Sequence, residues 1–305
     1  MKAEPVIQEL IGGRLHLSNG PIDVVLKAFG SARNVSHAHE AAARRFITIL
    51  PELCAELPDL RAPAGEAEPQ SRVGRRMAAA CQPFRKIFIT PMAAVAGAIA
   101  DELLAAMRAA APLDRAYVND GGDIAAFAGP GQTLDIAIAA VFSLGAIPFR
   151  SGTIQVRHGD GVGGIATSGA RGRSFSLGIA DSVTVLAKDG ATADAAATLI
   201  ANAVDCDDPA IERRPANDLD PDSDLGDLLV TVSVGQLAPA RRNAALAAGL
   251  ARARAYCARG LIIDAALTLQ GETVTLYSDS SSISKGSRRD RRSPKNRLQQ
   301  RGGSP

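Results

Sequence analysis

The sequence predicts an α+β domain, a layered α/β arrangement in which a mixed, largely antiparallel sheet packs with helices. Three observations support this class. Segments typical of hairpins stand near both ends of the chain. Between them, helical and extended segments are mixed without the strict alternation of a parallel βαβ fold. Hydrophobic residues make up 46% of the 305 residues, so the chain can bury a large core without disulfides or a structural metal.

The N-terminal part of the chain carries one predicted hairpin and two predicted helices. Residues 14–29 read as two strands around an Asn-Gly-Pro turn. A helix is expected over 36–53, with Ser36 as its N-cap. The clearest helix spans 90–110, where a threonine can cap and a proline fits the first turn. Between the two helices, 56–70 holds three prolines and is expected to be a loop.

The middle of the chain is predicted to be mainly extended. Residues 115–129 are expected to form a strand that breaks at a double glycine and resumes. Residues 133–139 and 152–158 alternate apolar and polar residues as strands do. The stretch 163–178 is rich in Gly, Ser and Thr and is expected to be an irregular loop. A buried strand over 181–188 then leads directly into an alanine-rich helix.

The C-terminal part of the chain is predicted to complete the sheet. Residues 227–237 look extended, and 239–260 read as a helix that a glycine ends. Residues 261–278 are expected to form a closing hairpin. We therefore expect a single domain over 1–278 and a disordered, polar and basic tail over 279–305.

Positive charge is concentrated at the C-terminus. Residues 285–301 contain eight Lys and Arg side chains and one Asp, which gives +7, so the rest of the chain carries −5 of the total +2. Such a tail can attract nucleic acid or an acidic partner through charge alone, or it can simply keep the protein soluble. For the body of the chain we expect no nucleic-acid partner. Aromatic residues are only 4% and tryptophan is absent, which leaves no base-stacking platform.

Cysteine usage and hydropathy predict a reduced, cytoplasmic protein. The four cysteines are far apart and form no C-x-x-C pair, which argues against a thiolate zinc site and against a secreted disulfide scaffold. The N-terminus, MKAEPVIQELIGG, lacks the apolar core of a signal peptide. No uncharged apolar run approaches the ~20 residues that span a bilayer, so we expect no membrane partner. The oligomeric state is not readable from the sequence.

The double-glycine strand is the first candidate for ligand binding. Asn119, Asp120 and Asp123 place oxygen atoms around Gly121 and Gly122. Glycines let the backbone approach a ligand closely or adopt a positive φ. The alternative is a bulge or a tight turn with polar residues beside it, which is the more common role of glycine in a strand.

A polar loop further along the chain is the second candidate. Thr167, Ser168 and Gly169 are followed by Arg171 and Arg173. Backbone N–H groups of such a loop can form a nest for an anion, and arginines suit phosphate, although a solvated loop is an equal alternative. The G-x-G-x-x-G match just upstream is set aside, because that fingerprint must open a helix after a strand.

The alanine-rich helix over 189–202 is the third candidate. If it begins near Thr192, Asp194 and Thr198 lie on one face, because they are four residues apart. A carboxylate and a hydroxyl are hard oxygen ligands suited to Mg²⁺. The alternative is that Asp194 complements the dipole of its own helix and that the hydroxyl of Thr198 bonds to a backbone carbonyl.

Taken in order, three segments of the chain resemble the ApbE-like superfamily. They read VAGAIADELLAAM…AYVNDGGDIAAFAG, ATSGARGR and DSVTVLAKDGATADAAATLIAN. The sequence is most similar to a smaller, uncharacterised ApbE-like family of cytoplasmic bacterial and archaeal proteins. There TPMAAVAGAIAD, the double-glycine strand, ATSG..GRS and the ADA.AT helix recur in this order, and DLGDLLVTVSVGQL and GLIIDAALTL also fit. The resemblance covers roughly residues 5–277.

The resemblance implies a ligand set and a reaction. Characterised members of the superfamily are FAD:protein FMN transferases, in which a metal neutralises the FAD diphosphate while a threonine hydroxyl of a target protein attacks. By this resemblance Asp194 and Thr198 bind Mg²⁺, with a backbone carbonyl as a further ligand. The nucleotide pocket is then lined by Asn119, Gly121, Gly122, Asp123, Thr167, Ser168, Gly169 and the neighbouring Arg173.

Two departures from the transferases bear on the chemistry. Their K-G-x-x-x-D segment reads AGAIAD here, so Ala96 replaces the lysine, while Gly97 and Asp101 remain as expected cofactor-binding residues. Their H-I-I-D-P-x-T-G motif is replaced by LGIADSV. Asp181 matches its aspartate and is the candidate catalytic residue, but the histidine is absent. The pocket keeps the metal cradle and loses positive charge and a proton-transfer group.

Three functions remain open from the sequence. The leading one is a nucleotide- or flavin-binding, Mg²⁺-dependent protein, in its most concrete form a transferase that acts on FAD. The second is an enzyme of another cofactor pathway on the same fold, such as one that handles a pterin or other one-carbon carrier. The third is a non-enzymatic binding protein that uses the basic tail.

Overall fold

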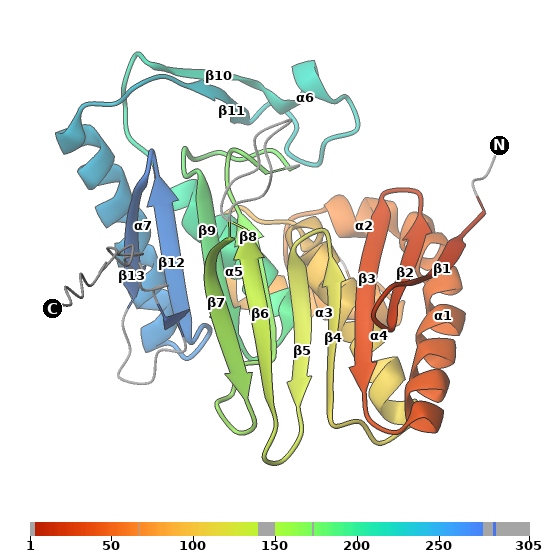
Figure 1. Ribbon diagram of the computed structural model, residues 1–305. Helices are drawn as coiled ribbons and strands as arrows, with labels where there is room; N and C mark the ends of the chain where they lie inside the picture. Colours follow the sequence, from red (N-terminus) through yellow and green to blue (C-terminus); the bar gives the residue numbers. More distant parts are fainter. Residues whose placement is uncertain (1–3, 67, 140–149, 173, 277–282, 285–305) are drawn as a thin grey trace, which may run out of the picture.

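The computed structural model describes residues 4–66, 68–139, 150–172, 174–276 and 283–284 (Figure 1). Its helices are α1 Ala32–Ala55, α2 Leu57–Arg61, α3 Arg72–Cys81, η1 Gln82–Phe84, η2 Pro91–Ala94, α4 Val95–Ala110, α5 Gly190–Ala203, α6 Ala216–Leu219 and α7 Pro239–Ala258. Its strands are β1 Val6–Leu10, β2 Arg14–Asn19, β3 Ile22–Phe29, β4 Arg115–Asp120, β5 Asp123–Ala128, β6 Thr133–Ala139, β7 Arg150–Arg157, β8 Gly164–Ser168, β9 Ser182–Ala187, β10 Ile211–Pro215, β11 Leu229–Val234, β12 Asp264–Leu269, β13 Glu272–Leu276 and β14 Ile283–Ser284. Of the predicted tail over 279–305, all but β14 lies outside the described residues.

Nine strands form one sheet, in the order β1-β2-β3-β4-β5-β8-β9-β12-β13. Each pair of neighbours in this sheet is antiparallel. Tight hairpins join β2 to β3, β4 to β5 and β12 to β13, where the sequence predicted turns. The predicted α+β class with a largely antiparallel sheet is therefore confirmed.

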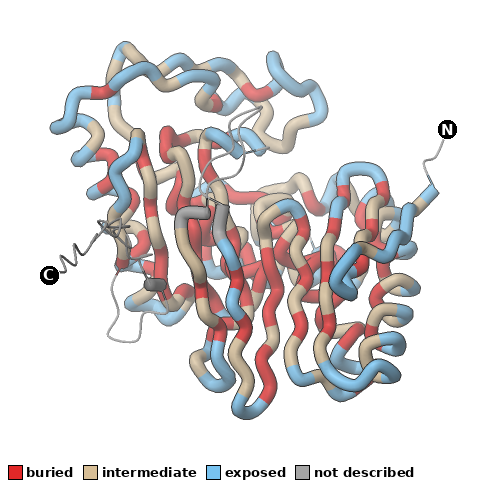
Figure 2. The backbone as a smooth tube through the Cα atoms, viewed as in Figure 1, coloured by how far each residue is buried: buried red, intermediate tan, exposed pale blue. Residues whose placement is uncertain are grey.

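The sheet has helices on one face and a small second sheet on the other. Helices α1, α4, α5 and α7 lie behind the sheet in Figure 1, and β6 and β7 lie in front of it. The helix side encloses the larger core, which includes Leu17, Leu26, Phe46, Ile99, Leu103 and Val183. The second core lies between the two sheets and includes Ile124, Leu134, Ile136, Ile154, Val156 and Ile165. Buried residues alternate with less buried ones along β3 and β4, whereas β5 and β9 are buried along most of their length (Figure 2). In the described part of the chain, none of the helices combines the length and apolar character needed to cross a membrane.

A two-stranded ribbon, β10 and β11, extends with α6 above one edge of the sheet (Figure 1). We call residues 211–234 the arm. The backbone N–H of Thr231 in the arm donates to the carbonyl of Ser176 at 2.8 Å. The hydroxyl of Thr90 is hydrogen-bonded to the carboxylate of Asp224. These two contacts connect the arm to the loop before β9 and to the segment before α4.

Two predictions for this part of the chain differ from the structure. Helix α1 starts at Ala32, because the hydroxyl of Ser31 accepts the N–H of Asn34 at 3.2 Å and caps it. The predicted cap, Ser36, is wrong: it lies inside the helix, and its hydroxyl donates to Glu40 at 3.0 Å. The predicted loop 56–70 also contains the short helix α2.

The predicted irregular loop over 163–178 is wrong at its start. Residues 164–168 form β8, which pairs with both β5 and β9. Its glycines serve close packing rather than loop flexibility. A Cβ added to Gly164 would lie 2.0 Å from backbone atoms of Asp189, so only glycine fits where β8 meets the start of α5.

Buried Asp264 gives a test of how burial sets stability against pH. Asp264 is 1% exposed, accepts the N–H of Ala265 at 2.8 Å, and has its pKa raised by burial to about 6 from a usual 3.8. The folded chain therefore binds this proton more tightly than the unfolded chain. The stabilising contribution is present below about pH 4 and is lost as the pH rises through 6.

We expect Asp264→Asn, which keeps the acceptor oxygen and removes the charge, to raise the free energy of unfolding at pH 8 by about 2 kcal/mol. At pH 4 the variant and the wild type should differ little. Urea unfolding at both pH values measures this. An equal gain at the two pH values would contradict the burial argument.

Candidate functional site

Helix α5 lies at the centre of the helical layer, against β8, β9, α4 and α7. From Gly190 to Ala201 each of its residues is buried except Asp194 and Thr198, which are half-buried. Their four-residue spacing places both on one face of the helix. The two predicted Mg²⁺ ligands are therefore the least buried residues of this stretch of α5.

The carboxylate of Asp194 lies at the N-terminus of α4. The N–H of Gly97 donates to Oδ2 at 3.1 Å, and the N–H of Ala96 also favours the ionised carboxylate. The local cap residue of α4, Ala94, has no side-chain hydrogen bond to offer, so Asp194 satisfies N–H groups of the first turn. Asp194 therefore complements the dipole of α4. The alternative that it complements the dipole of its own helix is wrong, because Asp194 lies beyond the first turn of α5.

Three carboxylates interact electrostatically near this helix end. Burial raises the pKa of Asp194 well above its usual value, and the carboxylate of Asp123 raises it further. Asp120 acts in the same direction, whereas the N–H groups of α4 lower the pKa in part. Such a concentration of negative charge favours a bound proton or a cation. The sequence placed Asp123 and Asp194 in one pocket, and the structure brings them together.

Asp101 holds α5 in the way that Asp194 holds α4. Its Oδ1 and Oδ2 accept the N–H groups of Gly190 and Ala191, both at 2.9 Å, and it is 8% exposed. Burial raises its pKa to about 6, although the two hydrogen bonds lower it. Asp101 was expected to bind the cofactor. Both of its oxygens instead accept the first N–H groups of α5, so its carboxylate positions that helix.

Helices α4 and α5 cross with their backbones in contact at glycine. A Cβ added to Gly97 would lie 2.2 Å from the carbonyl oxygen of Gly190. Each glycine N–H bonds to the aspartate of the other helix. Both helices carry the same spacing, a glycine followed four residues later by an aspartate: Gly97 with Asp101, and Gly190 with Asp194. This repeated spacing is the signal from which the reciprocal contact could have been inferred.

The double glycine forms the turn of the β4–β5 hairpin. Gly121 and Gly122 have φ values of 63° and 119°, and Oδ1 of Asn119 accepts the N–H of Gly122 at 2.8 Å. The tight-turn interpretation is therefore confirmed. The turn also fixes Asp123 beside the site, because Oδ1 of Asp123 accepts the N–H of Thr167 at 3.1 Å.

The Thr-Ser-Gly segment ends strand β8. The hydroxyl of Thr167 is hydrogen-bonded to that of Thr184 at 2.9 Å, and Ser168 is half-buried beside it. Gly169 has φ 152°, and a Cβ there would lie 2.7 Å from a backbone oxygen just before β9. Only glycine fits this position. The remaining predicted residue of the loop, Arg173, lies outside the described residues.

Asp181 has partners on both carboxylate oxygens. Nε of Arg171 lies 2.8 Å from Oδ1, and the N–H of Gln270 donates to Oδ2 at 2.6 Å. Both oxygens of Asp181 are therefore engaged by neighbouring groups. The catalytic role of Asp181 stays a prediction. The geometry favours a structural role, in which Asp181 holds Arg171 in place.

The residues present fit Mg²⁺ shared with a phosphate ligand. Among the residues that the structure describes, no group of three or more His, Cys, Asp or Glu side chains could hold a metal ion. Mg²⁺ does not require such a cage, because it keeps several waters and binds through one or two carboxylates plus substrate phosphates. Asp194 and Thr198 match that mode. The N–H of Gly97 orients the carboxylate of Asp194 by bonding to Oδ2.

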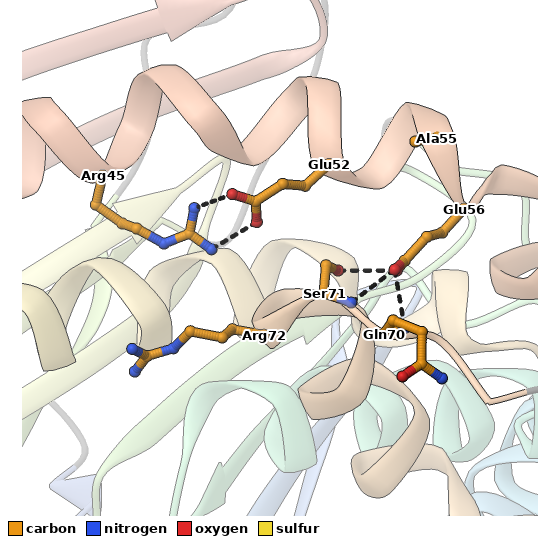
Figure 3. Close-up of a pocket in the computed structure, with 7 residues that line it drawn as sticks. All are labelled: Arg45, Glu52, Ala55, Glu56, Gln70, Ser71 and Arg72. Carbon is orange, nitrogen blue, oxygen red and sulfur yellow. Dashed lines mark hydrogen bonds and ion pairs between the residues drawn. The ribbon is translucent and has the colours of Figure 1, made fainter.

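A separate hollow of about 510 Å³ lies on α1 and α3 (Figure 3) and is lined by Arg45, Glu52, Ala55, Glu56, Gln70, Ser71 and Arg72. Its charged groups already bind one another. Two guanidinium nitrogens of Arg45 lie 2.8 Å from the oxygens of Glu52, and its Nε lies 2.9 Å from buried Glu102. Glu56 accepts the backbone N–H of Ser71 at 2.6 Å. We therefore interpret this hollow as a structural network.

Glu102 is the centre of that network, and its removal should be costly. It is 2% exposed and lies within 3.4 Å of three guanidinium groups, those of Arg45, Arg72 and Arg76. We expect Glu102→Ala to lower the free energy of unfolding by about 3 kcal/mol, because Arg45 is largely buried and loses a partner. Urea unfolding measures this. Glu40→Ala removes the exposed partner of Arg44 and should cost less than about 1 kcal/mol. Equal losses in the two variants would contradict the assignment.

Together these features define a class: an α+β protein with a nine-stranded antiparallel sheet and an oxygen-lined site between α4, α5 and the β4–β5 hairpin. The family described as AbpE bacteria matches residues 7–275, and this chain belongs to that family, within the ApbE-like superfamily. The predicted resemblance is confirmed.

Similar proteins include two from archaea. A UPF0280 protein of Methanothrix thermoacetophila is 36% identical over 167 residues, which are 53% of this chain and 67% of that protein. A UPF0280 protein of Methanopyrus kandleri is 34% identical over 199 residues, 63% of this chain and 75% of that protein.

Two solved structures are more distant. The flavin transferase ApbE from Vibrio cholerae gives a TM-score of 0.37 at 14% identity, with 90% of this chain and 97% of that chain covered. The flavinyl transferase ApbE of Pseudomonas stutzeri, in its apo form, gives 0.42 at 15% identity, with 91% and 94% covered.

Proposed function

We propose that this chain binds FAD or a related phosphorylated nucleotide cofactor together with Mg²⁺ and acts on it as a transferase. One observation carries the proposal. Asp194 and Thr198 are the two half-buried residues in the otherwise buried stretch 190–201 of α5, and the carboxylates of Asp123 and Asp120 act on Asp194. Membership of the ApbE-like superfamily supports the choice of a flavin nucleotide.

In this proposal each element has a defined task. Asp194 and Thr198 hold Mg²⁺, and the metal, when bound, neutralises charge on the diphosphate. The N–H of Gly97 fixes the carboxylate of Asp194. The β4–β5 turn and the end of β8 line the nucleotide beside the metal. The four cysteines are free, in keeping with our proposal of a reduced, cytoplasmic setting.

The transfer step is proposed separately from binding. Ala96 stands in the first turn of α4, beside Asp194, where the superfamily's transferases carry a lysine. The site therefore lacks one cation that those enzymes place there. This observation keeps a second candidate in view, in which the same cradle serves another phosphorylated cofactor, such as a pterin or other one-carbon carrier.

Calorimetric titration with FAD and FMN, with Mg²⁺ or with EDTA, tests the binding proposal. Release of AMP from FAD in the presence of a threonine-containing acceptor peptide tests transfer. We expect Mg²⁺-dependent binding of FAD. Binding without AMP release would reject the transferase reaction and keep the site. Binding of FAD that is equal in Mg²⁺ and in EDTA would reject the metal, and no binding of either flavin would favour the alternative cofactor.

A further inference from the structure

One guanidinium group is fixed beside the candidate nucleotide loop. Arg171 follows the Thr-Ser-Gly segment at the end of β8, and its side chain is 54% exposed. In the described part of the chain it has one ion pair, from Nε to Oδ1 of Asp181 at 2.8 Å. The N–H groups on its other two nitrogens can therefore meet a further anion, because the guanidinium carries five donors.

The loop that carries Arg171 is held by backbone hydrogen bonds. The N–H of Ala170 donates to the carbonyl of Ala180 at 2.8 Å, and that of Gly172 donates to Gly169 at 3.0 Å. The fixed backbone and the ion pair with Asp181 together reduce the freedom that the side chain of Arg171 would lose on binding a ligand. Arg171 is therefore preorganised rather than a freely moving surface arginine.

Asp181 is itself anchored from the far side. Its Oδ2 accepts the N–H of Gln270, which has φ 46°, an uncommon left-handed conformation for a residue other than glycine. The side chain of Gln270 accepts the N–H of Leu237 at 3.1 Å and donates to the carbonyl of Gly235 at 2.7 Å. This chain of contacts ties Asp181, and through it Arg171, to the β12–β13 turn and to the segment after the arm.

The loop starts at the candidate metal site. The N–H of Thr167 bonds to Asp123, and the carboxylate of Asp123 acts on Asp194. Arg171 is four residues further along the chain, and four residues span at most about 14 Å, so its Cα lies no further than this from Thr167. A planar guanidinium suits a phosphate through paired hydrogen bonds.

We propose that Arg171, held in place by Asp181, binds a phosphate of the nucleotide and supplies positive charge that the site lacks at Ala96. This inference rests on the proposed function. Arg171 is the phosphate-binding residue. Asp181 is a positioning residue that acts through it.

Riboflavin, FMN and FAD test the inference, because they share the isoalloxazine ring and differ in phosphate. We expect Arg171→Gln to weaken FMN and FAD binding about 10- to 100-fold in Mg²⁺ and to leave riboflavin binding unchanged. The affinity of Arg171→Lys for FMN and FAD should lie between those of the wild type and of Arg171→Gln. Arg44→Gln, which changes an exposed arginine on α1, is the control and should change none of the three. Equal weakening of riboflavin and FAD would overturn the phosphate contact.

A double-mutant cycle tests the role of Asp181. If Asp181 acts through Arg171, Asp181→Ala lowers FAD affinity in the wild-type background and causes no further loss in Arg171→Gln. A full additional loss would overturn the positioning role. If the wild type binds FAD and Arg171→Gln binds it equally well, this inference is rejected and the proposed function is kept. Wild-type protein that binds no flavin would reject the proposed function as well.

Discussion

Asp194→Asn is expected to remove the Mg²⁺-dependent part of FAD binding while the metal-free protein stays at least as stable as the wild type. The substitution takes away a negative charge that burial, Asp123 and Asp120 all disfavour. It keeps an oxygen that can accept the N–H of Gly97. It removes the anionic ligand, so Mg²⁺ affinity should fall by about 100-fold or more, beyond the effect of an outer-shell change.

Calorimetry with Mg²⁺ and FAD measures the affinity for the metal and the flavin. Thermal unfolding in EDTA measures the stability of the metal-free protein. Thr198→Val is the matched variant on the same face of α5. It removes a neutral ligand, so it should weaken Mg²⁺ binding without the gain in metal-free stability. Wild-type affinity for Mg²⁺ and FAD in Asp194→Asn would reject the metal assignment. A large loss of stability in EDTA would show that capping of α4 is the main role of Asp194.

Gly97→Ala is expected to lower the free energy of unfolding by about 3 kcal/mol or more. The new Cβ would lie 2.2 Å from the carbonyl oxygen of Gly190 and 2.4 Å from its carbonyl carbon, and both are backbone atoms that cannot rotate away. Helices α4 and α5 would have to separate. That movement lengthens the bond from Gly97 to Asp194 and the bond from Gly190 to Asp101 together.

Urea unfolding of Gly97→Ala and of Gly152→Ala measures this effect. Gly152 lies in β7, has no atom within 4 Å of an added Cβ and has no left-handed φ, so its variant should stay within about 0.5 kcal/mol of the wild type. The folded fraction of Gly97→Ala should also bind Mg²⁺ and FAD more weakly, because Asp194 loses its orientation. Equal stabilities of the two variants would mean that the crossing of α4 and α5 tolerates a methyl group.

Local patterns predicted those elements that local forces determine. The hairpin at 14–29, the helix at 239–260 and the hairpin at 261–278 carry turn residues, a proline at the helix start or a glycine at its end, and the structure confirms them. The predictions failed where a small residue serves a distant partner. Gly164 looked like a loop residue, but it lies in β8 because the backbone of Asp189 packs against it.

The site shows the same division. The spacing of Asp194 and Thr198 predicted a shared helix face, and the two are the half-buried residues of an otherwise buried stretch. The bond from the N–H of Gly97 to Oδ2 of Asp194 and the bond from Gly190 to Asp101 were not predicted, because they join residues 97 and 89 positions apart. The repeated glycine–aspartate spacing was their signal in the sequence, but only packing shows that the two helices cross there. Likewise Asp181 could be matched to an aspartate of a motif, whereas its bonds to Arg171 and Gln270 exist only after folding.

By itself the sequence determined the α+β class, the antiparallel hairpins, the family and the shared helix face of Asp194 and Thr198 on α5. These follow from periodicity, turn chemistry and ordered motifs, all of which act over short stretches of chain. Only the tertiary structure decided which carboxylates remain available for a ligand. Asp101 and Asp194 have the same glycine spacing, but both oxygens of Asp101 accept N–H groups of α5, while Asp194 accepts the N–H of Gly97 and is half-buried beside Asp123. The physical reason is that burial and hydrogen-bond partners, which only packing sets, determine what a carboxylate can bind.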